Sequence, residues 1–182
     1  MMDYLESMGL TPRKYILAVG RITPEKGFDY LIRAYQKAAI EDFKLVIAGG
    51  VEAESSYGDE LKELAKGRNV VFAGFVQGEK LEQLYMNTRL YVLSSLNEGF
   101  PLVLLEAMSY GLDVLVSDIP ATHLVELNSD DYFEKGNVDS LAQGLRRKLS
   151  GLYTKRAYAL DDFDWQKIAD RTEEIYRSVA VR

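Results

Sequence analysis

The stretch of residues 15–35 reads YILAVGRITPEKGFDYLIRAY and carries a strand signal, a turn and a helix signal in that order. It opens with a short aliphatic run of the kind found in buried strands. It ends with Phe28, Leu31, Ile32 and Tyr35 at i, i+3, i+4 and i+7, which gives a helix one apolar face. A strand that turns directly into a helix is the first half of a βαβ unit, so the stretch predicts an α/β fold.

The same alternation continues along the chain and predicts a Rossmann-like parallel sheet with helices on both faces. We expect strands at Tyr15–Val19, Phe43–Ala48, Val70–Ala73, Leu90–Leu93 and Val114–Val116, with a weaker one near Tyr132. We expect helices over Phe28–Tyr35, after Gly78, and over Leu102–Tyr110, Leu141–Leu149 and Asp164–Val179. The third is apolar nearly all round, which predicts a buried helix closed by Gly111. The last is amphipathic behind an N-cap at Asp164, so its apolar face is expected to pack somewhere.

Length and composition indicate one globular domain. The chain has 182 residues, of which 47% are hydrophobic and 27% charged, and no aliphatic run approaches the roughly 20 residues of a membrane span. We see no signal peptide. Residues 1–14 are expected to form a short helix or linker, and residues 15–182 the domain itself.

The charged and metal-binding residue types exclude several classes of function. The chain has no Cys, which excludes disulfides and thiolate metal sites, and its single His leaves little for an imidazole site. The absence of Cys is compatible with a reducing cytoplasm. The net charge of −6 argues against a broad nucleic-acid surface, which needs clustered Lys and Arg.

The turn between the first strand and the first helix lies where phosphate sites occur in such folds. It has neither the G-x-G-x-x-G fingerprint nor a P-loop. Thr23 can cap the helix with Pro24 at its first position, and Lys26 could then join Arg21 and the free helix amides around one anion. The alternative is that Arg21 and Lys26 are solvated loop charges.

A second segment, Ser94–Met108, ends a strand, turns through Gly99 and enters the apolar helix. It carries Glu98 and Glu106. A carboxylate inside an apolar helix is costly unless it is paired or faces a cleft, and the carboxyl end of a strand is where open α/β sheets bind ligands. We therefore expect both acids to line one crevice. The alternatives are a solvated loop acid for Glu98 and a position at the edge of the helix face for Glu106.

Together these segments resemble the group-one retaining glycosyltransferases, the superfamily that includes the glycogen and sucrose synthases. That family carries Gly-Arg, four residues and Lys-Gly after its first C-domain strand, and later Glu-Gly-Phe followed by a second Glu, with seven residues between the acids. The matching positions here are Gly20, Arg21, Lys26, Gly27, Glu98, Gly99, Phe100 and Glu106. The resemblance runs from about Tyr15 to the C-terminal helix.

The resemblance implies the C-terminal, donor-binding half of a GT-B-type enzyme, which transfers a sugar from a nucleoside diphosphate sugar to a hydroxyl acceptor with retention. It implies no metal and no cofactor. Arg21 and Lys26 would hold the donor diphosphate, Glu98 the sugar hydroxyls and Glu106 the ribose, with Arg21, Lys26 and Glu98 as the catalytic group. The implied donor-binding residues are Gly20, Gly27, Val76, Gly99, Phe100, Pro101, Leu102, Val103 and Glu106. The amides from Gly99 to Val103 would face sugar and phosphate, and the base would lie near Phe75 and Val76.

The sequence departs from the family pattern in two places. Asp113 stands where many members have Pro. Family enzymes are also roughly twice this length, with an N-terminal domain that supplies the acceptor site for a sugar, lipid or polysaccharide. We therefore expect an excised domain that is inactive alone, from a cytoplasmic enzyme that can be peripheral at the membrane. The alternatives are a stand-alone nucleotide-sugar-binding or regulatory module without catalysis, and an unrelated Rossmann-type oxidoreductase, which the missing glycine fingerprint weakens.

Three further features have simpler interpretations. Asp162-Phe163-Asp164 spells the Asp-x-Asp of metal-dependent glycosyltransferases, but it precedes a helix, which favours an N-cap. His123 follows Asp118-Ile119-Pro120 in a predicted loop, and this position favours a surface histidine over a catalytic one. Gly49-Gly50 can approach a donor or only make a turn.

Overall fold

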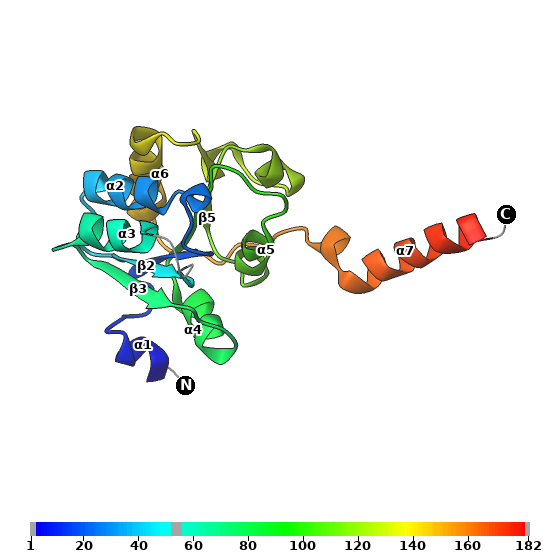
Figure 1. Cartoon of the computed structure of the whole chain (residues 1–182), viewed down its shortest axis with the longest axis horizontal. Coiled ribbons are helices and arrows are strands. Elements are labelled where there is room, and N and C mark those ends of the chain that lie inside the picture. Colours follow the sequence, from blue (N-terminus) through cyan, green and yellow to red (C-terminus); the bar gives the residue numbers. More distant parts are fainter. Residues whose placement is uncertain (1–2, 52–55, 181–182) are drawn as a thin grey trace.

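The computed structural model describes residues 3–51 and 56–180, and its described residues form one parallel sheet covered by helices (Figure 1). The strand order is β3-β2-β1-β4-β5-β6, and every neighbouring pair is parallel. The strands are β1 (Tyr15–Val19), β2 (Lys44–Ala48), β3 (Val70–Gly74), β4 (Leu90–Leu93), β5 (Val114–Ser117) and β6 (Tyr132–Phe133). The predicted strands are confirmed to within a residue at their ends, and so is the Rossmann-like fold.

Helices cover both faces of the sheet, as predicted. Two hydrophobic clusters form the core: α2, α3 and α6 pack on one face, and α1, α4 and α5 on the other (Figure 1). The helices are α1 (Asp3–Ser7), α2 (Phe28–Ala38), α3 (Tyr57–Ala65), α4 (Glu79–Asn87), α5 (Leu102–Ser109), α6 (Val138–Ser150) and α7 (Trp165–Ala180). The sequence prediction missed α3, because Leu61 and Ala65 are the only hydrophobic side chains that it buries fully.

The N-terminal residues contribute to the core as well as leading into it. Residues 1 and 2 of the expected linker lie outside the described residues, but α1 follows at Asp3. Leu5 and Leu10 are buried, and α1 packs against α4. The segment before β1 therefore packs against the same core as the strands.

The entrance to α2 differs from the prediction of one helix capped by Thr23. Pro24–Lys26 form a separate 3-10 turn, Thr23 makes no side-chain capping bond, and Gly27 has a left-handed φ of 63° before α2 begins. A Cβ atom on Gly27 would lie 2.3 Å from the carbonyl oxygen of Ser94. The chain must bend here because the turn is pressed against the end of β4, and only glycine fits.

The helix α5 is less buried than its composition predicted. Leu104, Ala107 and Met108 face the core, whereas Leu102 and Glu106 are exposed. The helix ends at Ser109 with Tyr110 as its C-cap, and Gly111 follows with a left-handed φ of 68°. One side of this apolar helix is therefore open to a ligand.

The C-terminal helix α7 has the predicted cap and, to within a residue, the predicted bounds, but the side chains of residues 165–179 are exposed. Asp164 Oδ1 accepts hydrogen bonds from the amides of Gln166 at 2.8 Å and Lys167 at 3.2 Å, which confirms the N-cap. The helix extends away from the sheet (Figure 1), and Trp165 is 73% exposed. The other helices already cover both faces of the sheet, so no face remains for α7. No helix in the described ranges is long and apolar enough to cross a membrane.

A group of four charged side chains fastens the chain before α7 to the sheet; we call it the Asp131 cluster. It consists of Asp113, Asp131, Lys148 and Arg156. Asp131 is 1% exposed and lies 2.6 Å from both Lys148 Nζ and Arg156 Nη1, and Asp113 contacts the same two cations at 2.7 and 3.1 Å. The amide of Arg156 also donates to the carbonyl of Gly111. Asp113, where many family members have Pro, thus joins an ionic network.

Candidate functional site

The loops that follow β1 and β4 meet at the carboxyl edge of the sheet. β1 pairs with β2 on one side and with β4 on the other, so the strand order reverses between β1 and β4. Open α/β sheets bind ligands at such a reversal. The amide of Leu96 donates to the carbonyl of Glu25 at 2.7 Å, and Ser94 Oγ donates to the carbonyl of Lys26 at 2.8 Å. These bonds join the two loops that carry the predicted site residues.

Lys26 and Glu98 form an ion pair across this junction. Lys26 Nζ lies 2.6 Å from Glu98 Oε1, and Ser95 Oγ donates to the same oxygen at 2.6 Å. The side chains are only 18% and 10% exposed. The alternatives of a solvated Lys26 and a solvated Glu98 are therefore wrong. Lys26 contacts a carboxylate, whereas the sequence prediction placed it with Arg21 around an anion.

Glycines bring the backbones of this edge close together. The stem of Lys26 runs over Gly20, where an added Cβ atom would lie 3.4 Å from Lys26 Cδ. An added Cβ atom on Gly49 would lie only 1.7 Å from the carbonyl oxygen of Gly20. Glycine is therefore required at position 49 because the loops after β1 and β2 pack closely together there. Arg21 lies exposed on the first of these loops.

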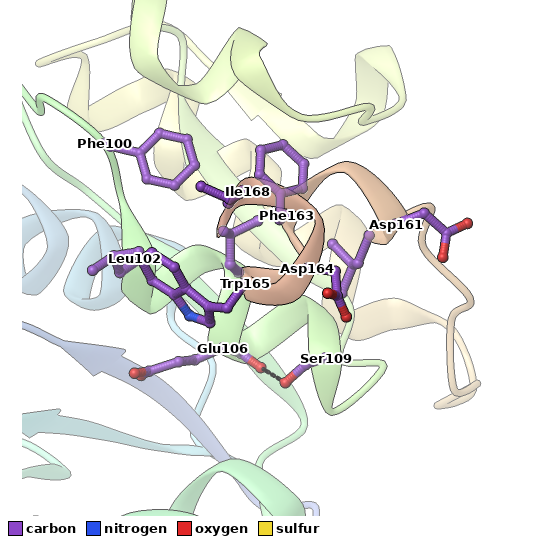
Figure 2. Close-up of a pocket in the computed structure, with 11 residues that line it drawn as sticks. Phe100, Leu102, Glu106, Ser109, Asp161, Phe163, Asp164, Trp165 and Ile168 are labelled. Carbon is purple, nitrogen blue, oxygen red and sulfur yellow. Dashed lines mark hydrogen bonds between the residues drawn. The ribbon is translucent and has the colours of Figure 1, made fainter. Parts of the chain in front are cut away.

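Glu106 lies on the open side of α5, where it lines a hollow of about 740 Å³ (Figure 2). Leu102 and Trp165 lie beside it in the same hollow. Glu106 Oε2 accepts a hydrogen bond from Tyr85 Oη at 3.0 Å. Glu98 does not line this hollow, so the structure does not place both acids in one crevice as predicted.

A buried tyrosine lies close to both acids. Tyr91, on β4, is fully buried, and its hydroxyl has no hydrogen-bond partner among the described residues. Burial raises the pKa of this hydroxyl well above its ordinary value, and the negative charges of Glu106 and Glu98 raise it further. Both carboxylates therefore lie near one buried residue, even though one hollow does not hold both.

The start of α5 brings the remaining predicted residues of this segment together. Pro101 occupies the N-cap position, and Phe100 packs its ring 5.7 Å from that of Phe163. The amide of Leu102 donates to the carbonyl of Phe100 at 3.0 Å, so this amide already has a partner within the chain. Gly99 is exposed and Val103 half-buried.

Val76 lies apart from the acids, in the loop between β3 and α4. With Phe75, Tyr4 and Lys80 it lines a second hollow of about 710 Å³. Phe75 is 75% exposed. The place predicted for the base therefore has its own concave surface, one that includes a side chain of α1.

The features with simpler interpretations lie away from this edge or on the surface. His123 is exposed, and its Nε2 lies 2.6 Å from Asp118 Oδ1. Asp162 is exposed and pairs with Arg171 at 3.6 Å. Across the described ranges there is no group of three or more His, Cys, Asp or Glu residues that could hold a metal ion.

Comparison with known sequences identifies the family. The sequence model described as "Glycosyl transferases group 1" matches residues 6–174. The chain belongs to this family. A protein of Methanocaldococcus jannaschii named as an uncharacterized glycosyltransferase is 35% identical to this group 1 glycosyltransferase over 96% of the chain and 48% of its own length. The chain thus spans about half the length of this relative.

Solved structures support the GT-B type of fold. The Anabaena protein HepE, solved in complex with UDP and glucose, matches 97% of this group 1 domain and 52% of its own chain, with a TM-score of 0.83 and 22% identity. The catalytic domain of cholesterol-α-glucosyltransferase from Helicobacter pylori matches 75% of the chain and 87% of its own, with a TM-score of 0.65 and 26% identity. The Rossmann-like, GT-B-type architecture expected from the sequence is confirmed.

Sequence analysis missed three residues that hold the site of this group 1 domain. Ser94 and Ser95 bond to Lys26 and Glu98, and Tyr85 bonds to Glu106. The two serines could have been found from their position at the end of β4, next to the predicted acid. Tyr85 carries no such signal, because its helical spacing is equally typical of a core residue.

Proposed function

We propose that this chain is the donor-binding domain of a retaining glycosyltransferase, and that it holds a nucleoside diphosphate sugar across the junction of the β1 and β4 loops. The observation that carries the proposal is the Lys26–Glu98 ion pair at the point where the strand order reverses. Membership of the group 1 family supports transferase activity, and the UDP and glucose of the HepE structure support the class of donor.

The residue roles follow from the charge that each side chain can supply. Arg21 and Lys26 bind the diphosphate and stabilise the negative charge that grows on it as it leaves. Lys26 exchanges the carboxylate of Glu98 for phosphate oxygens, which frees Glu98 to accept hydrogen bonds from the sugar hydroxyls. Glu106 accepts hydrogen bonds from the ribose.

The proposed reaction is front-face attack with retention. The bond between the anomeric carbon and the diphosphate oxygen breaks as the acceptor oxygen bonds to the same face of that carbon. The leaving diphosphate takes up the proton of the acceptor hydroxyl. No covalent intermediate on the protein is needed, and we propose that no metal or other cofactor takes part.

The acceptor and the location belong to the whole protein and are also proposals. We propose an acceptor sugar, lipid or polysaccharide bound by an N-terminal domain, and a cytoplasmic enzyme that can be peripheral at the membrane. The isolated chain is then expected to bind donor without transferring sugar. Sugar transfer by the purified 182-residue chain would contradict this division of labour.

A thermal-shift panel tests the proposed donor class. The ligands are UDP, GDP, ADP, their sugar conjugates and NAD, each added to the purified chain. A ligand that binds only the folded state raises the midpoint of unfolding, so one nucleoside diphosphate and its sugar conjugate are expected to do so. Stabilisation by NAD alone would favour an oxidoreductase and overturn the proposal.

A further inference from the structure

Tyr85 lies beneath Glu106 and reaches it with a single hydroxyl group. The side chain is on α4, is 1% exposed, and donates from Oη to Glu106 Oε2 at 3.0 Å. A second, longer contact of 3.4 Å runs to the carbonyl oxygen of Val103. A phenol has one proton to donate, so the shorter contact to the charged oxygen is the stronger bond.

The ring of Tyr85 is fixed by neighbours on both sheet and helices. It stacks on Tyr110 with ring centres 5.3 Å apart and an angle of 8°, and packs against Tyr91 at 5.9 Å. The residue before it is held too, because Tyr15 Oη donates to the carbonyl of Leu84 at 2.6 Å. A ring held in this way places its hydroxyl at one point beneath α5.

The hydroxyl of Tyr85 remains protonated under all ordinary conditions. Burial raises its pKa far above the ordinary value, and Tyr91 and the carboxylate of Glu106 raise it further. The group is therefore a permanent hydrogen-bond donor to a carboxylate. Such a donor occupies one carboxylate oxygen and leaves the other for a ligand.

We propose that Tyr85 is the positioning residue for Glu106: it holds Oε2 so that the other oxygen is presented to the vicinal hydroxyls of a ribose. This inference rests on the proposed function, in which Glu106 binds the ribose of the donor. A carboxylate on an exposed helix face has several rotamers, and ordering it before the ligand arrives removes part of the entropic cost of binding. Tyr85 contributes to ribose recognition without touching the ligand.

The experiment compares hydroxyl deletions in the same aromatic group. Tyr85→Phe removes the bond to Glu106. Tyr91→Phe is the matched control, since it removes a buried hydroxyl close to that of Tyr85 for which no hydrogen bond to Glu106 is found among the described residues. Glu106→Gln reports the effect of weakening the ribose contact itself. Calorimetry measures the affinity of each protein for UDP, GDP and ADP and for their 2′-deoxy and 3′-deoxy forms.

Tyr85→Phe is expected to lower the affinity for the bound nucleoside diphosphate about threefold to tenfold, the range expected for one hydrogen bond. The affinity for the deoxy forms should fall by a smaller factor. The preference for ribose, which is the ratio of the affinities for the ribose and deoxy forms, should therefore fall toward the value measured for Glu106→Gln. Tyr91→Phe should keep the full preference. A merely structural role for Tyr85 would weaken all forms by the same factor.

The outcomes separate this inference from the proposed function. If Glu106→Gln loses the ribose preference and Tyr85→Phe keeps it, the positioning role is wrong and the proposed function stands. If both variants keep the preference, Glu106 does not bind ribose. The proposed role of Glu106 and the positioning role of Tyr85 are then both wrong. If the wild-type chain binds none of the nucleotides, the proposed function fails and the inference falls with it.

A second control covers loss of stability. Tyr15→Phe removes a hydroxyl whose one bond within the described part of the chain goes to the backbone of α4, so it disturbs the same region without touching Glu106. If Tyr85→Phe and Tyr15→Phe lower the unfolding midpoint equally, only Tyr85→Phe should lower the ribose preference. Equal loss of preference in both variants would overturn the positioning role.

Discussion

Both edges of the sheet, where the amino ends and where the carboxyl ends of its strands lie, carry ionic groups of acidic and basic side chains. The two groups differ in how many charged residues they contain. At the amino edge, in the Asp131 cluster, two acids and two cations contact one another, and Asp131 and Asp113 each reach both cations. At the carboxyl edge one cation, Lys26, meets one acid, Glu98, with a serine as third member. The first group is electrically balanced within the chain. The second lies where the loops after β1 and β4 meet, and Arg21 is exposed on the first of these loops.

The difference shows that position on the sheet, more than residue type, separates a structural ion pair from a functional one. The Asp131 cluster joins β5, β6, α6 and the segment before α7, which are all parts of the fold. The Lys26–Glu98 pair joins two loops at the edge where α/β sheets bind ligands. Five predictions test this contrast.

The largest expected effect is the loss of stability on breaking the Asp131 cluster. Asp131→Asn leaves two cations with one acid between them in a nearly buried place, which costs about 3 to 5 kcal/mol of unfolding free energy. Denaturant unfolding measures it. Asp118→Asn is the control, because Asp118 belongs to an exposed pair with His123 and should change stability by less than roughly 1 kcal/mol. Equal effects would remove the distinction between buried and exposed pairs.

The same cluster predicts a pH dependence. Burial acts to raise the pKa of Asp131, but hydrogen bonds from Arg156 and Lys148 outweigh it and hold the pKa below its ordinary value. The stabilisation is therefore complete above the unfolded-state pKa of about 3.9 and is lost as the pH falls through the lower, folded-state pKa. Wild-type unfolding free energy should fall with acid over this range, and Asp131→Asn should show a flatter profile.

The next largest effect is expected at the carboxyl edge and concerns ligand binding. Lys26→Ala should lower the affinity for a nucleoside diphosphate by about tenfold or more, since hydrogen bonds to charged groups contribute roughly 1.5 to 3 kcal/mol. Nucleoside monophosphate should lose less, and the remaining affinity should depend less on salt. Lys62→Ala, at an exposed lysine of α3, is the control and should bind normally. Loss of folding stability with unchanged affinity would make Lys26 structural.

A smaller effect distinguishes the two members of the ion pair. Glu98→Gln removes the carboxylate that competes with phosphate for Lys26, so affinity for the plain nucleoside diphosphate should rise about twofold to fivefold. Affinity for the nucleoside diphosphate sugar should rise less or fall, because the contact to the sugar hydroxyls is weakened. Calorimetry with both ligands measures the ratio. A fall in affinity for both by the same factor would show that Glu98 only holds Lys26 in place.

The smallest expected effect is that of divalent metal, which should be none. Asp164 caps α7 and Asp162 pairs with Arg171, so the Asp-x-Asp stretch is engaged within the chain. Nucleoside diphosphate affinity should be the same with chelator and with manganese. A strict requirement for manganese would assign a metal to the donor site and end the simple contrast between the two edges.

Local patterns were sufficient to predict most of the fold. Short aliphatic runs gave β1 to β5, and helical spacing gave α2, α4 and α6, because a parallel sheet buried on both faces imposes both patterns. The helix α3 was missed because few of its side chains reach the core. The position of α7 could not be predicted, since an amphipathic pattern shows that a helix has an apolar face but not where a partner lies.

The site was predicted in part for a similar reason. Arg21, Lys26, Glu98 and Glu106 could be selected because motif spacing and strand ends mark them. The bond between Lys26 and Glu98 spans 72 residues, and that between Tyr85 and Glu106 joins two helices. Pairings of this kind arise from strand order, which no local window contains.

The pairing of β1 with β4 also sets the order in which the molecule can assemble as it is synthesised. β1, β2 and β3 are neighbours and can pair once the chain has reached Gly74. At that stage the loop with Lys26 is present, but Glu98 has not yet been made. The ion pair has to wait for β4 to add to the other side of β1, which closes a long loop and is correspondingly slow. A nascent chain therefore carries half a sheet with an unpaired lysine first, and the two loops of the site meet late in folding.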